Sequence, residues 1–348
     1  MKILFVTSSY QGGGAEAVVQ TLWEHAQQKC DVHWAVLRGG QVATTQSPES
    51  LHIINSTRTI FSFFKILKLL QKHNFDYVVS NLMYVNILMS IVCVISKTKL
   101  ICVEHNVIYV PFLKTYTKGR MQRFLAMMTY RLAGKVVAVS EGVKHDLVQH
   151  LNIPRSSVEV IHNPVKLSKS IYQNTSKSGI GYIGSHSAQK NVLFLIKSYC
   201  DYHRAHDNPE KLFIAGNVDA KTLGVYLRII NKLNPTARED IVFSGYVDRS
   251  SFYFARKVIV VPSYWEGFCN VVAESILHKT PVISTDCHSG PRDIVNLFGV
   301  GALIEIDNSS QLIDCLVRSL GNEQLIYTGD NLLSPENVWS KYYQLFKV

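Results

Sequence analysis

The feature that most constrains the fold is a regular alternation of short apolar runs with helical patterns, which continues along nearly the whole chain. Such runs are typical of strands buried on both faces, and their alternation with helices predicts βαβ units and parallel sheets. We expect strands at residues 2–7, 31–36, 51–54, 76–80, 99–103 and 135–139 in the first half, and at 179–183, 211–215, 241–243, 258–261, 281–285 and 302–305 in the second.

The alternation stops once, at residues 163–178, NPVKLSKSIYQNTSKS, where the chain is polar, rich in Ser and Lys and without periodicity. We therefore expect two doubly wound α/β domains, at residues 1–163 and 164–334. Residues 335–348 have the pattern of a final helix, which we expect to pack back towards the N-terminal domain. Ligands of such sheets bind beyond the carboxyl ends of the strands, so two sheets that face each other predict a site in the cleft between them.

The composition places the chain among globular proteins with two sizeable cores. It has 348 residues, of which 47% are hydrophobic. The longest apolar stretch, residues 82–95, is too short for a membrane span and contains Asn86 and Ser90, so it predicts a buried helix. The apolar run at the N-terminus predicts a strand and not a secretory signal. Seven cysteines without C-x-x-C spacing indicate reduced thiols in a cytoplasm and no structural zinc.

The net charge of +10 is concentrated in the first half of the chain. Residues 1–165 hold 17 Lys and Arg against 9 Asp and Glu, whereas residues 166–348 hold 19 against 17. The first half is therefore expected to face an anionic partner, for which nucleic acid, anionic lipid and a phosphorylated acceptor are the candidates.

Two segments carry this excess. Residues 59–72 place three lysines on one helical face, and residues 109–131 mix basic and aromatic residues with no Asp or Glu. Basic groups beside aromatic residues favour a lipid surface or an anionic lipid-linked acceptor. A helix that faces the core and carries a solvated basic stripe has the same pattern. The residues that we expect to contact acceptor or membrane are Lys114, Lys118, Arg120 and Arg123.

Two loops have the composition of anion-binding turns. Glycines 12–14 lie between the first strand and a helix that begins near Ala15, and GYIGSHSAQKN opens a helix with Lys190 at its start. Glycine lets backbone N–H groups approach a ligand oxygen at the positive end of a helix, and a lysine there can hold a phosphate. A tight turn without a ligand and a solvated lysine are the alternatives. The glycines do not follow the G-x-G-x-x-G spacing, and no Walker lysine follows them.

Two further polar stretches follow strands. His105 lies in EHN at the end of strand 99–103, where it would meet a ligand or bond to the backbone of its loop. In EGFCNVVAE, Glu266 falls in a loop and Glu274 one turn inside the following helix. The loop carboxylate can accept hydrogen bonds from sugar hydroxyls, and the helical one can accept both hydroxyls of a ribose. Two carboxylates could instead be the acid and base of a glycosidase, but no other stretch is typical of a sugar-hydrolase barrel.

Together these stretches resemble glycosyltransferase family 4, retaining enzymes with the GT-B fold of two Rossmann-like domains across a cleft, over nearly the whole chain. The resemblance is carried by the two glutamates with seven residues between them in PSYWEGFCNVVAE, the glycine loop, the His after a strand, VAVSEGVKHDL, VIHNPV, FSGYVD and KTPVISTDCHSGPRDIV. It implies that Glu274 binds the ribose of a nucleotide sugar, that Glu266 holds the donor sugar and that Lys190 holds the diphosphate.

The same resemblance implies the roles of further residues. The catalytic residues are Glu266, His105 and Lys190, with His105 contacting the donor sugar from the N-terminal domain. The donor-binding residues are Gly13, Gly14, Ser185, His186, Lys190, Tyr246, Glu266, Gly267, Phe268, Cys269, Asn270, Val271 and Glu274. Transfer would retain configuration by front-face attack, without a metal or any cofactor besides the nucleotide sugar.

One departure from the family pattern concerns charge. The family has Arg directly after the glycine of its phosphate loop, where this chain has Ser185. A charge-assisted hydrogen bond contributes about 1.5–3 kcal/mol, so we expect a neighbouring group to replace it. His186 and Arg292 are the candidates.

These patterns predict a hexosyl- or N-acetylhexosaminyltransferase that uses a nucleotide sugar, with a UDP-sugar as the expected donor. The acceptor would be a lipid-linked, lipopolysaccharide, capsule or exopolysaccharide glycan, and the enzyme would lie in the cytoplasm at the anionic inner-membrane surface, with no nucleic-acid partner. The alternatives are a GT-B nucleotide-sugar epimerase, which needs no acceptor, and a non-catalytic subunit that binds glycan or supports another transferase. A Rossmann dehydrogenase is disfavoured because its glycine fingerprint is missing.

Overall fold

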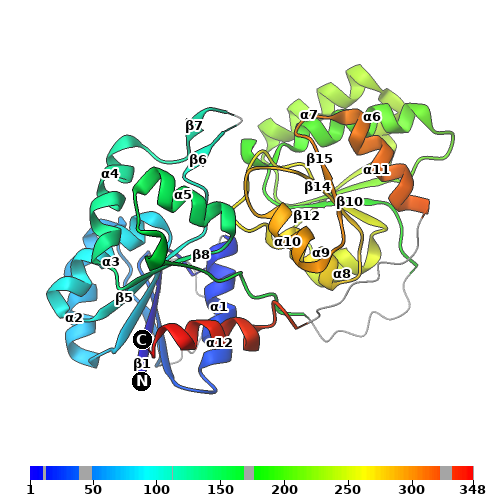
Figure 1. Ribbon diagram of the computed structural model, residues 1–348. Coiled ribbons are helices and arrows are strands. Elements are labelled where there is room, and N and C mark those ends of the chain that lie inside the picture. The colour runs from blue at the N-terminus through cyan, green and yellow to red at the C-terminus, as the bar shows by residue number, and fades with distance from the viewer. Residues whose placement is uncertain (11–12, 39–48, 112, 168–175, 322–330, 348) are drawn as a thin grey trace. The chain divides into compact units, whose positions relative to one another are not determined.

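The computed structural model describes residues 1–10, 13–38, 49–111, 113–167, 176–321 and 331–347 (Figure 1). Gly12 and residues 168–175 of the predicted linker lie outside this range. The chain divides into two compact units, of which unit 1 comprises Met1–Lys166 with Asn331–Val348 and unit 2 comprises Leu167–Asp330. The sequence places the corresponding boundaries after residues 163 and 334.

Unit 1 is built around a parallel sheet. Its strands are β1 (Lys2–Thr7), β2 (Asp31–Val36), β3 (Leu51–Ile53), β4 (Tyr77–Asn81), β5 (Lys99–Glu104), β8 (Lys135–Ala138) and β9 (Val158–Val160). Their order is β3-β2-β1-β4-β5-β8-β9, and every pair in the sheet is parallel. Because the chain moves from β1 to one side and then returns to the other, β1 and β4 flank the switch point at which ligands bind in such sheets.

The helices of unit 1 form two layers. They are α1 (Gly14–Ala26), α2 (Phe63–His73), α3 (Met83–Ser96), α4 (Arg120–Thr129), α5 (Glu141–Leu151) and α12 (Pro335–Leu345), with short 3₁₀ turns η1 (Thr59–Ser62), η2 (Tyr130–Leu132) and η3 (Arg155–Ser157). Helices α2, α3, α4 and α5 pack in a row, each against the next, while α12 packs against α1 (Figure 1). Tyr77 donates a hydrogen bond to the Phe346 carbonyl, so the end of the chain is tied to β4.

Three details of unit 1 differ from the sequence-based expectation. Strand β9 and the antiparallel hairpin of β6 (Tyr109–Val110) and β7 (Thr115–Tyr116) were not predicted. The apolar stretch 82–95 corresponds to α3 (Met83–Ser96), but the prediction of a buried helix is only half right. Its inner side is buried, whereas Ile91, Val94 and Ile95 are exposed. The stretch has no charged residue, and such composition normally belongs to a helix covered on all sides.

Unit 2 repeats the architecture with a second parallel sheet. Its strands are β10 (Ile180–Ile183), β11 (Leu212–Ala215), β12 (Ile241–Gly245), β13 (Val258–Val261), β14 (Val282–Thr285) and β15 (Ala302–Ile304), in the order β12-β11-β10-β13-β14-β15. Its helical segments are η4 (Ala188–Lys190), α6 (Val192–Ala205), α7 (Ala220–Leu233), η5 (Pro235–Asp240), α8 (Arg249–Ala255), α9 (Asn270–Leu277), α10 (Pro291–Phe298) and α11 (Ser309–Gly321). The switch point lies between β10 and β13.

The predicted fold class is confirmed, because both units are doubly wound α/β sheets of the same strand order. Local signals explain several helix starts. The side chains of Ser140, Asp219, Asp248 and Ser334 accept hydrogen bonds from backbone N–H groups in the first turns of α5, α7, α8 and α12. Within the described ranges, no helix combines the length and the apolarity that a membrane span needs. The seven cysteines are free thiols.

Candidate functional site

In unit 2, an ion pair joins the two loops at the switch point. The loop after β10 carries Lys190, and the loop after β13 carries Glu266. Lys190 Nζ donates to Glu266 Oε1 over 2.6 Å, and both side chains are largely buried. Burial, the largest single influence, lowers the pKa of Lys190, but the charge and hydrogen bond of Glu266 together with nearby Cys269 and Cys287 raise it. The net pKa lies above its usual value, so the amine stays charged.

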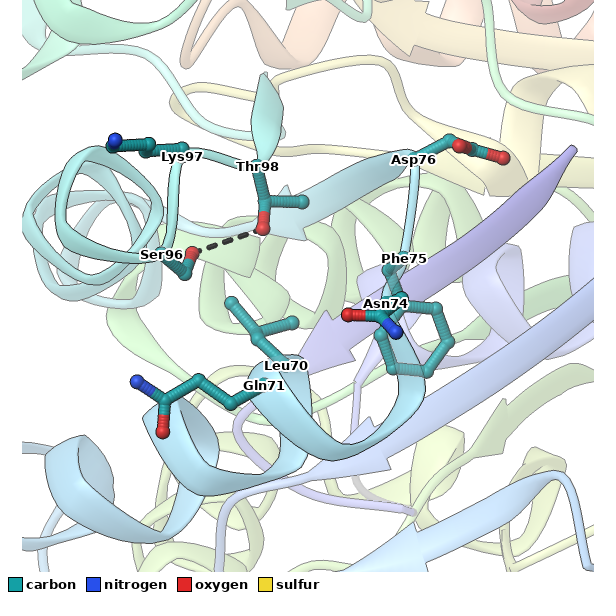
Figure 2. A pocket seen from close by; sticks show the side chains of 8 residues that line it. All are labelled: Leu70, Gln71, Asn74, Phe75, Asp76, Ser96, Lys97 and Thr98. Atoms are coloured by element: carbon teal, nitrogen blue, oxygen red, sulfur yellow. Dashed lines mark hydrogen bonds between the residues drawn. The ribbon is translucent and has the colours of Figure 1, made fainter.

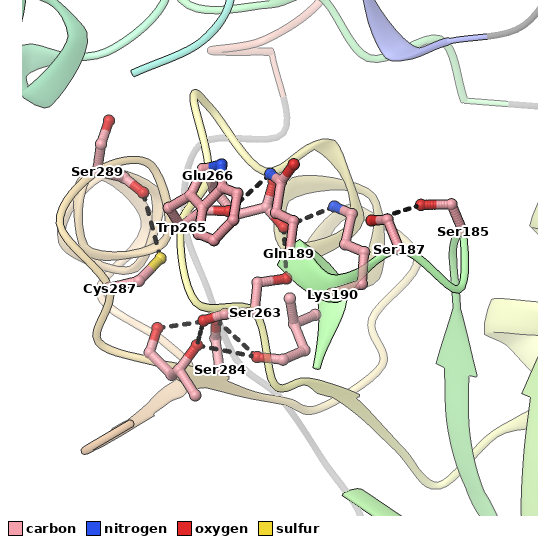
Figure 3. A network of polar contacts seen from close by, with 12 residues as sticks. Ser185, Ser187, Gln189, Lys190, Ser263, Trp265, Glu266, Ser284, Cys287 and Ser289 are labelled. Atoms are coloured by element: carbon pink, nitrogen blue, oxygen red, sulfur yellow. Dashed lines mark hydrogen bonds and ion pairs between the residues drawn. The ribbon is translucent and has the colours of Figure 1, made fainter. Parts of the chain in front are cut away.

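The surrounding contacts hold this pair in place (Figure 3). Ser263 Oγ also donates to Glu266 Oε1, over 2.6 Å, and Gln189 Nε2 donates to the Trp265 carbonyl over 2.7 Å. The Tyr264 N–H donates to the Gln189 carbonyl over 2.8 Å, so the two loops are linked on both sides of the pair. No donor among the described residues contacts Glu266 Oε2, which leaves that oxygen to accept a hydroxyl.

Glu274 lies in α9, as the sequence predicts, and two residues of α8 hold it. Arg249 Nε donates to Glu274 Oε2 over 2.8 Å, Arg249 Nη2 donates to the same oxygen, and Tyr253 Oη donates to it over 2.7 Å. All three donors use Oε2. The other oxygen, Oε1, has no donor among the described residues and can accept hydrogen bonds from a ligand.

The backbone between the two glutamates is unusual. Cys269 has φ 71° in the left-handed region and precedes the first residue of α9. Its thiol is buried, and burial together with nearby Glu266 raises its pKa well above the usual value, so the thiol is protonated. Gly290, with φ +91°, lies so close that a Cβ there would be 2.6 Å from the Phe268 carbonyl oxygen. Asn270 and Val271 form the first turn of α9, after Gly267.

The groups around the missing arginine are placed as follows. Ser185 is exposed, and its hydroxyl is 3.3 Å from that of Ser187. His186 lies between the rings of Tyr182 and Tyr226, and burial lowers its pKa, so it is neutral near pH 7. Arg292 is ion-paired with Asp286 through Nε, at 2.8 Å, and Nη2. Whether either group replaces the missing cation stays a prediction, although neither offers a free positive charge here.

Tyr246 and two glycines complete the unit 2 loops. Tyr246 follows β12 and its side chain is 86% exposed, so it is available to a base. Gly216, at the end of β11, has φ +132°, and a Cβ there would be 1.9 Å from the Gly184 carbonyl oxygen. Only glycine allows the loops after β10 and β11 to approach so closely.

In unit 1, the glycine loop after β1 meets a carboxylate. Glu16 is buried in the first turn of α1 and accepts hydrogen bonds from Ser9 Oγ, at 2.9 Å, and Ser8 Oγ, at 3.3 Å. A Cβ on Gly13 would be 2.7 Å from Glu16 Oε2, and Gly14 is the first residue of the helix. A carboxylate in this position disfavours a second anion, so Gly13 and Gly14 are better suited to neutral sugar hydroxyls than to a phosphate.

His105, after β5, is buried and linked to β4. Its Nε2 is 2.9 Å from Asn81 Oδ1, while Asn81 Nδ2 donates to the Val6 and Val79 carbonyls. The Asn81 oxygen must therefore accept, so Nε2 carries the proton and Nδ1 is the basic nitrogen. Nδ1 is buried and has no partner among the described residues. Burial lowers the pKa of His105 to about 4, and the neutral ring can accept a hydroxyl.

Residues next to His105 form a buried polar network. Tyr130 Oη donates to Glu104 Oε2 over 2.8 Å, Asn86 Nδ2 donates to Tyr130 Oη over 2.9 Å, and Ser80 Oγ donates to Asn86 Oδ1 over 2.6 Å. Burial raises the pKa of Glu104. The network fixes the ends of β4 and β5 that carry Asn81 and His105.

The four basic residues predicted to contact acceptor or membrane lie together around the hairpin and α4. Lys114 is in the turn between β6 and β7, Lys118 precedes α4, and Arg120 begins it. The guanidinium of Arg123 stacks on the Tyr116 ring, 3.4 Å from its centroid. Lys114 and Arg120 are exposed, Lys118 and Arg123 are half-buried, and residues 109–131 contain no acidic residue.

Two pockets of unit 1 lie away from these residues. One, lined by Leu70, Gln71, Asn74 and neighbours, lies between the carboxyl ends of α2 and α3 (Figure 2). The other is lined by residues of β5, η2 and α12, including Lys99, Leu132 and Leu345. Both lie at the amino ends of the central strands, whereas the switch point opens at their carboxyl ends. Neither pocket contains a cluster of catalytic groups.

Sequence reasoning missed several residues that position the site. Arg249 and Tyr253 hold Glu274, Ser263 holds Glu266, and Asn81 fixes the tautomer of His105. The spacing of Arg249 and Tyr253, one helical turn apart after Asp248, indicates a shared helix face, but nothing in the sequence indicates that this face meets α9. Asn81 directly follows the predicted strand 76–80, and a polar residue at the carboxyl end of a strand is the one signal that was present.

Two family models show to which family the chain belongs. Residues 12–169 match the model for Glycosyltransferase Family 4, and residues 177–322 match the model for Glycosyl transferases group 1. Together they cover most of both units. The chain belongs to these GT-B glycosyltransferases, and the resemblance seen in the sequence is confirmed.

Relatives and solved structures agree with this assignment. The chain is 26% identical over 336 residues, 91% of this chain and 89% of the other, to N-acetylgalactosamine-N,N'-diacetylbacillosaminyl-diphospho-undecaprenol 4-alpha-N-acetylgalactosaminyltransferase of Campylobacter jejuni. It is 24% identical over 235 residues, 66% of this chain and 62% of the other, to the amylovoran biosynthesis glycosyltransferase AmsD of Erwinia amylovora. The fold matches Anabaena Alr3699/HepE in complex with UDP and glucose, with TM-score 0.76, 17% identity and coverage of 99% and 95%.

Proposed function

We propose that the protein is a retaining glycosyltransferase that moves a hexose or N-acetylhexosamine from a UDP-sugar to a lipid-linked or polysaccharide glycan. The observation that carries the proposal is the Lys190–Glu266 pair at the switch point of unit 2, with Glu274 one turn into the helix that follows. The undecaprenol-linked substrate named for the Campylobacter relative and the polysaccharide named for AmsD support the acceptor class. UDP in the Anabaena structure supports the donor class.

The unit 2 residues divide the donor between them. Glu274 Oε1 accepts the ribose hydroxyls while Arg249 and Tyr253 hold Oε2. Glu266 Oε2 accepts a hydroxyl of the donor sugar, and Lys190 faces the diphosphate, where its charge is fixed before the ligand arrives. A preorganised cation at the point where charge develops is the main source of catalysis in such sites. Tyr246 contacts the base.

The reaction needs no protein base. The bond between the anomeric carbon and the diphosphate oxygen breaks, and the acceptor oxygen forms a bond to the same face of that carbon. The acceptor proton passes to the leaving phosphate, whose new charge Lys190 and the amino end of α9 stabilise. The nucleotide sugar is the only cosubstrate of this scheme, which uses no metal.

A thermal-shift screen of the full chain against UDP, GDP, ADP and their sugar conjugates tests the donor. A ligand at about 100 times its dissociation constant adds near 2.7 kcal/mol to stability. We expect a selective rise in melting temperature with UDP and with one UDP-sugar. Glu274→Gln should bind these ligands about ten- to a hundredfold more weakly and show a smaller rise, because charge-assisted hydrogen bonds contribute about 1.5–3 kcal/mol. Glu239→Gln, an exposed residue of η5, is the control.

The outcomes separate the alternatives. If none of the nucleotides raises the melting temperature, the donor assignment is overturned and a subunit that only binds glycan is favoured. A UDP-sugar that is converted without any acceptor would instead indicate an epimerase. If transfer occurs, the anomeric configuration of the product, determined by NMR, decides between retention and inversion.

A further inference from the structure

Helix α3 exposes an apolar side that the chain itself does not cover. Residues 83–96 contain no charged side chain, and the outer positions Ile91, Val94 and Ile95 are 42%, 54% and 52% exposed. A helix that is apolar all round normally lies inside a core or a membrane. Here one side packs on the sheet, and the other side needs a different explanation.

The neighbouring helices extend the same surface. On η1 and α2, Ile60, Phe61 and Phe64 are exposed, Phe64 by 78%. On α4, the exposed apolar side chains are Met121, Phe124, Leu125 and Met128, and Leu132 of η2 and Leu113 of the hairpin turn add to them. Since α3 packs between α2 and α4, these side chains belong to one outward surface, which we call the apolar–basic face.

Helix α5 provides an internal contrast, because it belongs to the same row of helices and has an ordinary surface. Its exposed positions are Glu141, His145 and Gln149. The outward side chains of α12 are likewise mostly polar. Unit 1 can therefore present a polar helix surface. Its apolar exposure is concentrated on η1, α2, α3, α4, η2 and the hairpin, and the other exposed large hydrophobic side chains among its described residues are Met1, Ile53, Leu332 and Tyr343.

The charge around the apolar side chains is of one sign. Between residues 58 and 135 the chain has 12 Lys and Arg and 2 Asp and Glu. Of the two acids, Glu104 is fully buried, and Asp76 is exposed just before β4, where it accepts a hydrogen bond from the Lys2 N–H. Lys65, Lys68 and Lys72 are exposed on α2 beside Phe64.

We propose that the apolar–basic face docks onto an anionic lipid bilayer, with its apolar side chains at the boundary of the acyl chains and its lysines and arginines among the headgroups. This combination of exposed large apolar groups and a one-sided basic rim is what interfacial binding requires. A second copy of the chain fits less well, because a two-fold contact would bring two basic surfaces together. The docking does not depend on which donor the enzyme uses.

Sedimentation with lipid vesicles tests the proposal on the full chain without any glycan acceptor. We expect binding to vesicles of phosphatidylcholine with phosphatidylglycerol and little binding to phosphatidylcholine alone. The variant Lys65→Gln/Lys68→Gln/Lys72→Gln should bind about a hundredfold more weakly, since each basic residue near an anionic surface contributes roughly fivefold. The variant Phe64→Ser/Ile95→Ser/Phe124→Ser should bind anionic vesicles at least about tenfold more weakly, because it has less apolar area to bury in the bilayer.

The matched control is Leu233→Ser/Val317→Ser, which removes exposed apolar side chains from unit 2 and should bind vesicles like the wild type. Equal binding to neutral and anionic vesicles, or unchanged binding of the apolar variant, would overturn the proposal. Sedimentation velocity without lipid tests the rival explanation, in which a second copy of the chain covers this face. A dimer that the apolar variant dissociates would assign the face to a second copy.

A depth measurement distinguishes insertion from electrostatic adhesion. With bilayers that contain brominated acyl chains, the fluorescence of Phe124→Trp should be quenched beyond that of the wild type. Tyr343→Trp, on exposed α12, should show no extra quenching. Absence of quenching at position 124 in a vesicle-bound protein would contradict insertion of this face.

Discussion

The two units share the strand order of their sheets but differ in the character of their surfaces. In both, the first strand lies between the second and the fourth, and the ligand-binding loops follow from this order. Among the described residues, however, unit 2 exposes four large hydrophobic side chains, namely Leu167, Leu233, Tyr246 and Val317, while thirteen are exposed between residues 60 and 132 of unit 1 alone. The shared topology positions the loops, and the surface that each unit presents determines its partner.

The loops differ as well. In unit 2 the switch point contains a buried charge pair, Lys190 and Glu266, suited to a charged diphosphate and a sugar. In unit 1 the corresponding edge contains neutral His105 with Asn81, and Glu16 against the glycine loop. A site of this kind suits hydroxyl groups. We infer that the donor's charge is handled by unit 2 and that unit 1 contributes neutral contacts and the lipid surface.

The largest expected effect is on turnover through Glu266. Glu266→Gln keeps the shape but removes the negative charge that holds Lys190, so we expect transfer to fall by about 10²–10³-fold, as for loss of one preorganised electrostatic contact. Lys190→Met should have a similar effect, and the double variant should lose less than the product of both. Product formation under single-turnover conditions measures this. Wild-type turnover of Glu266→Gln would contradict the charge-based role of unit 2.

The next effect is on the stability of unit 2. Gly216→Ala places a Cβ against the Gly184 carbonyl at a φ of +132°, and we expect a loss of about 3 kcal/mol or more. Gly224→Ala, in α7 with no atom near the added Cβ, should stabilise by about 0.5–1 kcal/mol. Calorimetry should show both changes in the transition of unit 2, with that of unit 1 unaltered. A Gly216→Ala protein that melts like the wild type would disprove the close approach.

A change of pH dependence is expected in unit 1. Because the pKa of His105 is lowered to about 4, its ring is neutral down to acidic pH in the wild type. Asn81→Asp puts a carboxylate beside Nε2 and should raise this pKa, moving the acidic limb of the rate profile up by about 1–3 pH units. Asn81→Leu should reduce the rate without moving the limb. An unshifted profile for Asn81→Asp would argue against His105 as the neutral acceptor.

The smallest effect is a gain in donor affinity. Ser185→Arg restores a cation in the phosphate loop of unit 2, and we expect UDP to bind about tenfold more tightly, the low end for a charge-assisted bond. Ser187→Arg, also exposed in this loop, is the control for a general change in charge. Titration calorimetry compares the two. Equal tightening by both variants would mean that position 185 has no special geometry.

Much of the fold could be predicted because its signals are local. The twelve predicted strands are all present, since buried parallel strands are continuous apolar runs. Strand β9 was missed because three residues that include Glu159 have no such pattern. Glu266 and Glu274 could be related because one helix start sets their spacing. Arg249 could not be related to Glu274, and Asn81 could not be related to His105, because tertiary packing alone brings them together.

Helix α3 shows a different limit of sequence reasoning. An uncharged helix indicates burial, but the pattern does not say whether the cover is part of the same chain. The structure covers one side and leaves Ile91, Val94 and Ile95 exposed. The error is informative, because the unmet expectation of burial is the structural observation from which the proposal of a lipid-docking face starts.

The division of tasks between the units is tested most directly by hydrogen–deuterium exchange of the full chain with UDP and, separately, with anionic vesicles. The account predicts that UDP protects residues 184–191 and 262–274 of unit 2, and that vesicles protect residues 60–72, 91–96 and 113–132 of unit 1. Protection of the unit 1 segments by UDP, or of the unit 2 loops by vesicles, with the other regions unchanged, would contradict it.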